Sequence, residues 1–284
     1  MTHQELIQQL YHFSKIQIQP ISGGDINAVY SVTNENKEKA VIKINDAETY
    51  PQMLAKEEQG LNELRKNETL NIPTIQKNGE LEGFQYLILE YIEQGQVDAS
   101  FWQSFGYGLA KLHDISETNF GFVEDNYIGS LHQSNLQCES WTEFLINQRL
   151  IPQVKLAVDH GIINQAESKQ IERIYAEVDN LWPAEKPALL HGDLWSGNYI
   201  QGAQNKPYLI DPAVYYGHRE MDLGMMHLFG GFEVTLFEFY NETYPLETGW
   251  KSRIKYNQLY PLLVHLNLFG KTYFNQIRAI VNPF

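Results

Sequence analysis

The chain has 284 residues, which is enough to bury a large core and to fold as two lobes. Hydrophobic residues make up 43% of it, aromatic residues 13% and charged residues 20%, a composition typical of globular proteins. The formal net charge of -14 argues against a nucleic-acid or anionic-membrane partner, because phosphate groups bind to basic surfaces.

The N-terminal segment MTHQELIQQLYHF lacks the charged-then-apolar layout of a signal peptide. No apolar run in the sequence approaches the roughly 18 residues of a membrane-spanning helix. The single cysteine, Cys138, excludes an internal disulfide bond and agrees with a reducing compartment. We therefore expect a cytoplasmic protein, in which Cys138 fills a buried or half-buried position.

The first third of the chain predicts a small antiparallel sheet with one helix packed on it. Apolar residues recur at helical spacing in two segments, and β-rich runs are separated by the glycine pair of ISGGDINAVYSV and by the polar turn TNENKEK. The predicted elements are a helix over 1–13, strands over 21–32 and 40–45, a helix over 50–67 and a strand over 84–93.

After the polar connector EQGQVDAS, the pattern changes to helices with periodic apolar faces. These helices are expected over 100–114, 140–159, 164–181 and from 221 to the end, with a strand-turn-strand over 198–211. The fold class predicted is therefore α+β and bilobal. Residues 1–92 form a sheet-rich N-terminal lobe, residues 93–284 form a large helical C-terminal lobe, and a ligand is expected in the cleft between them.

The segment LLHGDLWSGNYI, residues 189–200, places a dense polar group between two apolar runs. Asp193 and Asn198 within it are five residues apart, which is the spacing of the catalytic Asp and the metal-holding Asn of kinases. A second metal-holding Asp follows the next strand in kinases, and YLIDPA puts Asp211 there. HGD or GxN alone is typical of an ordinary turn, so the interpretation as a kinase site depends on support elsewhere in the chain.

That support comes from a lysine and a glutamate in the N-terminal lobe. Lys43 in AVIKI lies among alternating apolar residues, either as an exposed strand lysine or as the lysine that kinases pair with nucleotide phosphates. On a helical wheel Glu57 falls within the apolar face of its helix, and Glu58 falls at the rim. A carboxylate on that face is costly unless a cation meets it, so we predict that Glu57 pairs with Lys43.

The pair Gly23-Gly24 precedes the Lys43 strand, where kinases have the loop that covers the phosphates. The segment is not a GxGxxG motif, and two adjacent glycines alone are typical of a hairpin turn. It therefore supports the kinase interpretation only together with the other parts.

These residues resemble the fructosamine kinases, also called ketosamine 3-kinases, within the protein-kinase-like fold that includes aminoglycoside phosphotransferases and choline kinases. The resemblance runs along most of the chain, through GGDINAVY, VIKIN, WTEFLINQRLIPQ, LLHGDLWSGN and DPAVYYGHREMDLGMMHLFGGF. The HGD-x4-N core is shared by the wider superfamily, whereas Trp195 and the run YYGHREMDL are similar to fructosamine kinases in particular.

The resemblance implies a role for each matching residue. Asp193 would be the catalytic base, and Asn198 and Asp211 would hold Mg²⁺. Lys43 and Glu57 would form the ion pair at the ATP phosphates. The main chain of Glu90, Tyr91 and Ile92 would receive the adenine, and Gly23, Gly24, Asp25, Ile26 and Asn27 would form the loop over the phosphates.

Four further residues are candidates for support or substrate contact, and three of them have two interpretations each. Asp222 is either a helix cap or, as in related kinases, a support that accepts backbone N–H groups of the catalytic loop, and His191 would play a similar supporting part. Trp195 is either a core aromatic residue or a wall for the sugar. His218, with Arg219, either touches the substrate or belongs to a surface Arg-Glu cluster.

We therefore expect an ATP- and Mg²⁺-dependent kinase that phosphorylates the 3-hydroxyl of ketosamines, such as fructosamine, ribulosamine or erythrulosamine adducts on amines or glycated protein lysines. One alternative is another acceptor, such as an aminoglycoside, choline or a plain sugar. The other is a nucleotide-binding module without catalysis, which need not keep Lys43, Glu57, Asp193, Asn198 and Asp211 together.

Overall fold

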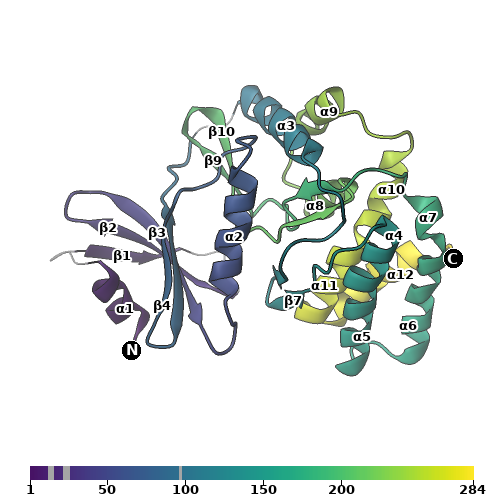
Figure 1. The fold of residues 1–284 in the computed structure, drawn as a ribbon, viewed down its shortest axis with the longest axis horizontal. Helices are drawn as coiled ribbons and strands as arrows, with labels where there is room; N and C mark the ends of the chain where they lie inside the picture. The colour runs from purple at the N-terminus through teal and green to yellow at the C-terminus, as the bar shows by residue number, and fades with distance from the viewer. Residues whose placement is uncertain (12–15, 22–25, 96–97) are drawn as a thin grey trace.

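The computed structural model describes residues 1–11, 16–21, 26–95 and 98–284. Figure 1 shows two lobes, a sheet-rich one built from the N-terminal third and a larger one that is mainly helical. The bilobal α+β fold predicted from the sequence is confirmed. The strand β5 (Phe84–Glu90) is the last strand of the sheet in chain order, and α3 (Ala99–Asp114) is the first helix of the helical lobe.

The N-terminal lobe is a five-stranded antiparallel sheet in the order β1-β2-β3-β5-β4. Besides β5, its strands are β1 (Ile16–Pro20), β2 (Ala28–Asn34), β3 (Lys39–Asp46) and β4 (Ile75–Leu81). The sequence predicted β2, β3 and β5 and missed the two edge strands. Both edge strands are rich in polar residues, and β1 ends in a proline, so neither carries the apolar signal of a buried strand.

Two helices cover opposite faces of this sheet; the sequence predicted both of them, over 1–13 and 50–67, but only one as packed on the sheet. On one face α1 (His3–Leu10) buries Leu6 and Ile7 against Ile42 and Ile44 of β3. On the other face, toward the helical lobe in Figure 1, lies α2 (Met53–Arg65). Because strand side chains alternate between faces, Lys43 points to the α2 side. The alternation of AVIKIN therefore places one lysine under α2.

The C-terminal lobe packs its helices around a continuous apolar core. Besides α3, its helical segments are α4 (Trp141–Phe144), the π-helix η1 (Leu145–Leu150), α5 (Ile151–Asp159), α6 (Gln165–Glu172), the 3₁₀-helix η2 (Arg173–Glu177), α7 (Val178–Leu181), α8 (Glu220–Phe229), α9 (Val234–Thr243), α10 (Trp250–Asn257), α11 (Leu259–Phe269), the 3₁₀-helix η4 (Lys271–Tyr273) and α12 (Phe274–Val281). The helix predicted over 140–159 thus contains a π turn, and the one over 164–181 is interrupted by a 3₁₀ turn.

Short strand pairs frame the polar segment after residue 190. The strands β8 (Ala188–Leu190) and β11 (Tyr215–Gly217) pair with each other, and β9 (Tyr199–Gly202) pairs with β10 (Lys206–Leu209) across the 3₁₀ turn η3 (Ala203–Asn205). The predicted strand-turn-strand is confirmed. A further pair, β6 (Asn126–Ile128) and β7 (Leu131–Gln133), was not predicted. The segment between β8 and β9 is therefore held at both ends by strands.

Two further expectations from the sequence concern the single cysteine and membrane-spanning helices. Cys138 is buried and free of a disulfide bond. Within the part of the chain that the structure describes, no helix is both long and apolar enough to cross a membrane.

Candidate active site

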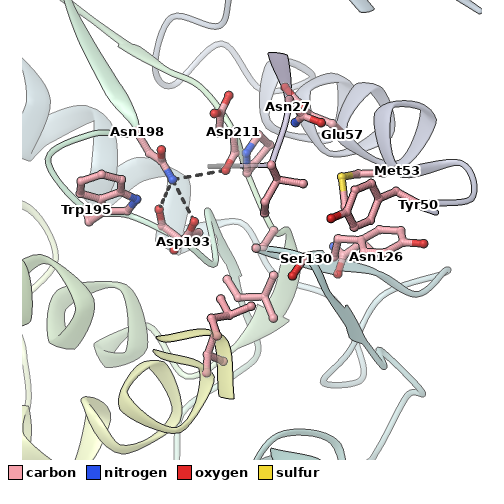
Figure 2. Close-up of a pocket in the computed structure, with 18 of the residues that line it drawn as sticks. Asn27, Tyr50, Met53, Glu57, Asn126, Ser130, Asp193, Trp195, Asn198 and Asp211 are labelled. Carbon is pink, nitrogen blue, oxygen red and sulfur yellow. Dashed lines mark hydrogen bonds between the residues drawn. The ribbon is translucent and has the colours of Figure 1, made fainter. Parts of the chain in front are cut away.

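A cleft of about 650 Å³ is lined by residues of both lobes. From the N-terminal lobe come Lys43 of β3 and Glu57 of α2, and from the C-terminal lobe come Asp193, Asn198 and Asp211. Figure 2 shows several of these side chains around the cleft, with Asp193 and Asn198 directed toward one another. Residues up to 168 positions apart in the chain thus meet at one end of the cleft.

Lys43 lies at the centre of a buried charge cluster. Its Nζ is 2.6 Å from Oε1 of Glu57, and it also contacts Oδ1 of Asp211. The side chains of Lys43 and Glu57 are 5% and 9% exposed, whereas that of Asp211 is 41% exposed toward the cleft. The predicted pairing of Glu57 with Lys43 is therefore present.

The phase of α2 decides which of two neighbouring glutamates makes this pair. The apolar face of α2 buries Met53, Leu54 and Leu61 against the sheet, and Glu57 lies on that face. Glu58 lies at the rim instead and accepts a hydrogen bond of 2.7 Å from the side-chain amide of Asn78. The sequence-based choice between the two residues is confirmed.

The charges in this cluster hold one another in place. Burial acts to lower the pKa of Lys43, but the carboxylates of Asp211 and Glu57 overcome it and raise the pKa above its usual value. Burial raises the pKa of Glu57, with Lys43 opposing the shift and Asp211 adding to it. Lys43 is therefore a permanent cation in the wall of the cleft.

The loop between β8 and β9 brings Asp193 and Asn198 together. The side-chain amide of Asn198 donates to the main-chain oxygen of Asp193 at 2.8 Å and to its Oδ2 at 3.0 Å. The same amide lies 3.5 Å from the main-chain oxygen of Asp211, and these contacts are drawn in Figure 2. The five-residue spacing thus closes a loop in which one amide fixes the carboxylate of Asp193.

The environment of Asp193 perturbs its acidity. Burial raises the pKa of Asp193 to about 7, and the hydrogen bond from Asn198 opposes the shift. The negative charges of Asp211 and Asp222 act in the same direction as burial. Carboxyl groups with pKa values near neutrality are typical of acid–base groups in active sites.

Asp211 lies just beyond β10 in the left-handed backbone region, with φ of 54°. Its neighbours fix this conformation: Ile210 N–H donates to the oxygen of Asn198 at 3.1 Å, and Ala213 N–H donates to the oxygen of His191 at 2.9 Å. A left-handed backbone at a residue other than glycine is costly and persists where the surroundings determine it. The turn therefore directs the Asp211 carboxylate toward Lys43.

Asp222 supports the loop that carries Asp193. This matches the second of its two interpretations, in which it accepts backbone N–H groups of that loop. Its carboxylate accepts the backbone N–H groups of His191 at 2.8 Å and of Gly192 at 3.0 Å. It also lies 3.2 Å from Nε2 of His113, whose Nδ1 is 2.8 Å from the hydroxyl of Tyr240. Although burial acts to raise the pKa of Asp222, the contacts with His113 and His191 hold it below its usual value.

His191 ties the same loop to the segment that carries Asp211. Its Nε2 donates to the main-chain oxygen of Ile210 at 2.8 Å, while Nδ1 accepts from Asp193 N–H at 3.3 Å. The side chain is fully buried, and burial lowers its pKa, so it is neutral at pH 7. The geometry fits the supporting part expected for His191.

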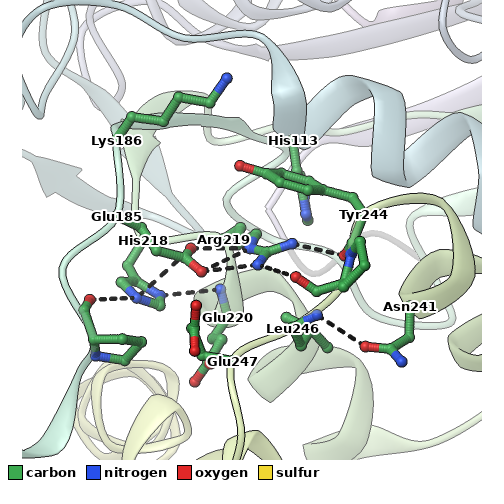
Figure 3. Close-up of polar contacts among 12 residues, drawn as sticks. His113, Glu185, Lys186, His218, Arg219, Glu220, Asn241, Tyr244, Leu246 and Glu247 are labelled. Atoms are coloured by element: carbon green, nitrogen blue, oxygen red, sulfur yellow. Dashed lines mark hydrogen bonds and ion pairs between the residues drawn. The ribbon is translucent and has the colours of Figure 1, made fainter.

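His218 and Arg219 lie away from the cleft, in a buried polar cluster shown in Figure 3. Arg219 makes a two-pronged pair with Glu185 at 2.8 and 2.9 Å and donates to the oxygens of Tyr244 and Pro245. His218 Nε2 donates to the oxygen of Pro183 at 3.2 Å. Neither residue is among those that line the cleft. The Arg-Glu cluster exists, but it is buried and not on the surface as expected.

Trp195 lines the cleft next to Asp193. Its ring is half-buried and meets the ring of Phe229 edge-on, with centroids 6.2 Å apart. A Cβ atom added at Gly197 would lie only 2.3 Å from the Trp195 ring, so the glycine makes room for the indole. Of the two interpretations of Trp195, a wall of the cleft fits this position better than a core residue.

Of the two segments expected around the nucleotide, the one with the glycine pair is only partly described. Gly23, Gly24 and Asp25 lie outside the described residues, while Ile26 and Asn27 line the cleft. Oδ1 of Asn27 accepts a hydrogen bond of 2.9 Å from Asn45. At the other segment, the N–H of Glu90 already donates to the oxygen of Thr74 at 2.8 Å. An adenine contact at this segment would therefore not use the N–H of Glu90.

Sequence reasoning missed four aromatic side chains of the C-terminal lobe that line the cleft. These are Phe229, His265, Phe269 and Tyr273. They come from α8, α11 and η4, so no spacing in the chain brings them together. The sequence does carry a signal for two of them. A Phe-Gly pair stands at the end of α8 and at the end of α11, so each helix ends at a phenylalanine that lines the cleft.

The whole chain matches the model of one protein family. Residues 1–284 match the family described as fructosamine kinase. A probable ketoamine kinase of Enterococcus faecium is 37% identical over 267 residues, covering 93% of this chain and 94% of that protein. The protein-ribulosamine 3-kinase of Arabidopsis thaliana, named as chloroplastic, is 35% identical over 242 residues, covering 82% of this chain and 72% of that protein.

Solved structures agree with this similarity. The crystal structure of a protein assigned as a fructosamine-3-kinase from Thermobifida fusca YX-ER1 superposes with a TM-score of 0.86 at 29% sequence identity. The similarity covers 98% of this chain and 96% of that one. It therefore includes both lobes and the cleft between them.

Proposed function

Because this chain belongs to the fructosamine kinase family, we propose that it transfers the γ-phosphoryl group of ATP to the 3-hydroxyl group of ketosamines. The acceptors proposed are fructosamine, ribulosamine and erythrulosamine adducts of amines, including those on glycated protein lysines. The names of the similar proteins, ketoamine kinase and protein-ribulosamine 3-kinase, support this acceptor class.

The observation that carries the proposal is the meeting of Lys43, Asp193 and Asp211 at one end of the cleft. Phosphoryl transfer needs fixed positive charge at the phosphates and an acceptor for the proton of the attacking hydroxyl. Lys43 supplies the first, aimed by the carboxylate of Glu57. Asp193 supplies the second, since its carboxylate lines the cleft and is held in one direction by the amide of Asn198.

The donor set beside Asp193 fits Mg²⁺. Mg²⁺ is bound in proteins through one or two carboxylates together with substrate phosphates and waters. Asp211 offers a partly exposed carboxylate, and Asn198 offers its amide oxygen because its NH₂ group is engaged with Asp193. We propose these two residues as the Mg²⁺ ligands. When bound, the ion neutralises charge that develops on the transferred phosphoryl group.

The remaining residues orient these groups. Asn198 holds the carboxylate of Asp193 in one direction, and Asp222 fixes the backbone of the residues just before it. His191 joins that loop to the turn at Asp211. Because Asp193 is already oriented, it needs no reorganisation during the reaction. The rigid loop therefore contributes to the rate.

The boundaries of the nucleotide site and the lobes stay proposals. We propose residues 1–92 as the nucleotide-binding lobe and 93–284 as the catalytic and substrate lobe. Gly23, Gly24, Asp25, Ile26 and Asn27 are proposed to cover the phosphates, and the main chain at Glu90, Tyr91 and Ile92 to meet the adenine.

His218 is proposed as a structural support. A cytoplasmic location also stays a prediction.

A screen of acceptors tests the proposed function. The protein is incubated with ATP, Mg²⁺ and one acceptor at a time, and ADP release is measured for ketoamines, plain sugars, choline and aminoglycosides. Turnover with ketoamines well above all other acceptors is expected. Turnover only with an aminoglycoside, choline or a plain sugar would show a different acceptor class, and ATP binding without turnover would show a module that lacks catalysis.

A further inference from the structure

The segment that begins at Asp211 is buried without being part of a strand. Residues 211–214 lie between β10 and β11, and Ala213 and Val214 are 2% and 0% exposed. A buried main-chain carbonyl group outside a strand pair is costly unless another donor reaches it. The carbonyl groups of these two residues therefore need donors from elsewhere in the fold.

Two side-chain amides of the β6–β7 hairpin supply these donors. Nε2 of Gln133 donates to the main-chain oxygen of Ala213 at 3.2 Å. Nδ2 of Asn126, which also lines the cleft (Figure 2), donates to the main-chain oxygen of Val214 at 2.8 Å. Nε2 of Gln133 donates in addition to Oδ1 of Asn126 at 2.8 Å, so the two amides hold each other as well as the segment.

Three further buried side chains determine which way these amides face. Oε1 of Gln133 accepts from the hydroxyl of Tyr260 at 2.7 Å. Oδ1 of Asn126 accepts from Nδ2 of Asn135 at 3.1 Å, and Oδ1 of Asn135 accepts in turn from the guanidinium of Arg149 at 2.7 Å. An amide whose oxygen is taken by a donor turns its NH₂ group the other way. We call these five residues, Asn126, Gln133, Asn135, Arg149 and Tyr260, the amide network.

Arg149 gives the outer end of the amide network a permanent positive charge. It belongs to the π-helix η1 and is fully buried, with Cζ 4.5 Å from the ring centroid of Phe144 and 4.1 Å from that of Tyr215. A hydrogen bond from a charged donor is roughly twice as strong as one between neutral groups. The guanidinium therefore fixes the amide of Asn135, and the order of donors and acceptors continues from there to the segment after Asp211.

Two other elements contact the same segment. The N–H of Ala213 donates to the main-chain oxygen of His191 in the catalytic loop at 2.9 Å. Gly60 of α2 lies against Pro212 and Val214, since an added Cβ atom would be 3.2 Å from each of their side chains. The catalytic loop, α2 and the amide network thus meet at four residues, the first of which is the proposed Mg²⁺ ligand.

The left-handed backbone of Asp211, with φ of 54°, persists only where its surroundings determine it. We propose that Gln133 and Asn126 are positioning residues for the metal site, which act through the main chain of Ala213 and Val214 to aim the carboxylate of Asp211. This inference rests on the proposed Mg²⁺ site and adds the residues that hold it in place. It also gives a role to the segment WTEFLINQRLIPQ, from which Arg149 comes.

The test compares nucleotide binding with and without Mg²⁺ in the whole protein. Calorimetric titration with the non-hydrolysable β,γ-imido analogue of ATP gives Kd in Mg²⁺ and Kd in EDTA, and their ratio measures the gain due to the ion. Gln133→Leu keeps the approximate size of the side chain and removes its donor and acceptor. It should reduce the gain about tenfold, the lower end of the cost of losing a partner behind a metal ligand, while Kd in EDTA stays unchanged.

A milder variant keeps the test decisive if Gln133→Leu does not fold. Tyr260→Phe removes only the hydroxyl that orients Gln133, and it should reduce the gain about threefold, the size of one neutral hydrogen bond. Asp211→Asn should remove most of the gain. His132→Ala is the matched control, because His132 lies next to Gln133 on the same hairpin and its side chain is 64% exposed. It should leave the gain as in wild type.

A wild-type gain in Gln133→Leu, or in Tyr260→Phe if only that variant folds, would overturn the inference. So would an equal weakening of binding in Mg²⁺ and in EDTA, which would mean a general structural role without an effect on the metal site. A wild-type protein whose affinity for the nucleotide analogue is the same in Mg²⁺ and in EDTA would overturn the proposed Mg²⁺ site, and the inference with it.

Discussion

Lys43 and Glu57 form a buried ion pair in which Nζ lies 2.6 Å from Oε1, with a strand contributing one partner and a helix the other. The pair links α2 to the sheet at the edge of the cleft. Lys43 also contacts Asp211 of the other lobe, so its position depends on two carboxylates that pull from different sides. Removal of either one should displace the lysine toward the other.

Glu57→Gln should therefore impair turnover, because Lys43 is then held by Asp211 alone and drawn away from the phosphates. We expect kcat/KM for ATP to fall about tenfold or more, which corresponds to roughly 1.4 kcal/mol of lost transition-state stabilisation. Glu58→Gln is the matched control: its side chain can still accept from Asn78, and its effect should stay within about 0.5 kcal/mol. A larger loss in Glu58→Gln than in Glu57→Gln would contradict this assignment.

Asp193→Asn should separate binding from chemistry. An amide keeps the shape of the side chain but cannot take the proton of the attacking hydroxyl. We expect kcat to fall by roughly 10²-fold or more, within the range of general-base assistance, while ATP still binds. Steady-state kinetics with a ketosamine, together with calorimetric titration of ATP, measure the two quantities. Near-normal kcat in this variant would exclude Asp193 as the base.

Gly192→Ala should destabilise the protein strongly. Gly192 has φ of 83°, and a Cβ atom there would lie 2.0 Å from the main-chain oxygen of Ala213. Gly83 has nearly the same φ, 81°, with open space around it, so Gly83→Ala should cost only the left-handed backbone penalty of about 1–2 kcal/mol. We expect Gly192→Ala to cost at least about 2 kcal/mol more in urea unfolding. Equal losses would show that the loop adapts to the extra atom.

His218 should make folding stability depend on pH. The ring is fully buried, its Nδ1 accepts from Glu220 N–H at 3.3 Å, and burial lowers its pKa (Figure 3). The unfolded chain then binds a proton below the ordinary histidine pKa of about 6.5, where the native protein does not. The contribution of His218 to stability is therefore present above that pH and is lost as the pH falls through it.

The free energy of unfolding, measured between pH 8 and pH 5 for wild type and His218→Asn, checks this sign. Wild type should lose more stability on acidification than the variant does. His160→Asn removes an exposed histidine and serves as the control. A pH profile for His218→Asn that parallels wild type would show that His218 does not contribute to the acid sensitivity.

The sequence predicted the parts of the fold and site that depend on local pattern. The periodicity of α2 was sufficient to choose Glu57 over Glu58, because a carboxylate on a buried face needs a cation. The five-residue spacing of Asp193 and Asn198 was sufficient to bring them together, since a loop fixed between two strands leaves them few other positions.

What could not be predicted depends on tertiary contacts. The polar edge strands β1 and β4 are stabilised by pairing with neighbours and not by their own apolar residues. His218 and Arg219 are charged or polar, which suggested a surface, yet Glu185 from a distant segment satisfies Arg219 in the interior. The rings of Phe229, His265, Phe269 and Tyr273 come from three separate segments, α8, α11 and η4, and only the tertiary fold brings them to one cleft.

The most direct measurement follows the product of the reaction by mass spectrometry. Loss of a C1 proton from a ketosamine 3-phosphate gives an enaminol, from which phosphate is a far better leaving group than hydroxide. A peptide with a ribulosamine- or fructosamine-bearing lysine, incubated with the protein, ATP and Mg²⁺, should first gain the mass of one phosphate. It should then return to unmodified lysine as a trappable 3-deoxyosone appears. A phosphate that stays on the peptide, at a hydroxyl other than that of C3, would contradict phosphorylation of the 3-hydroxyl.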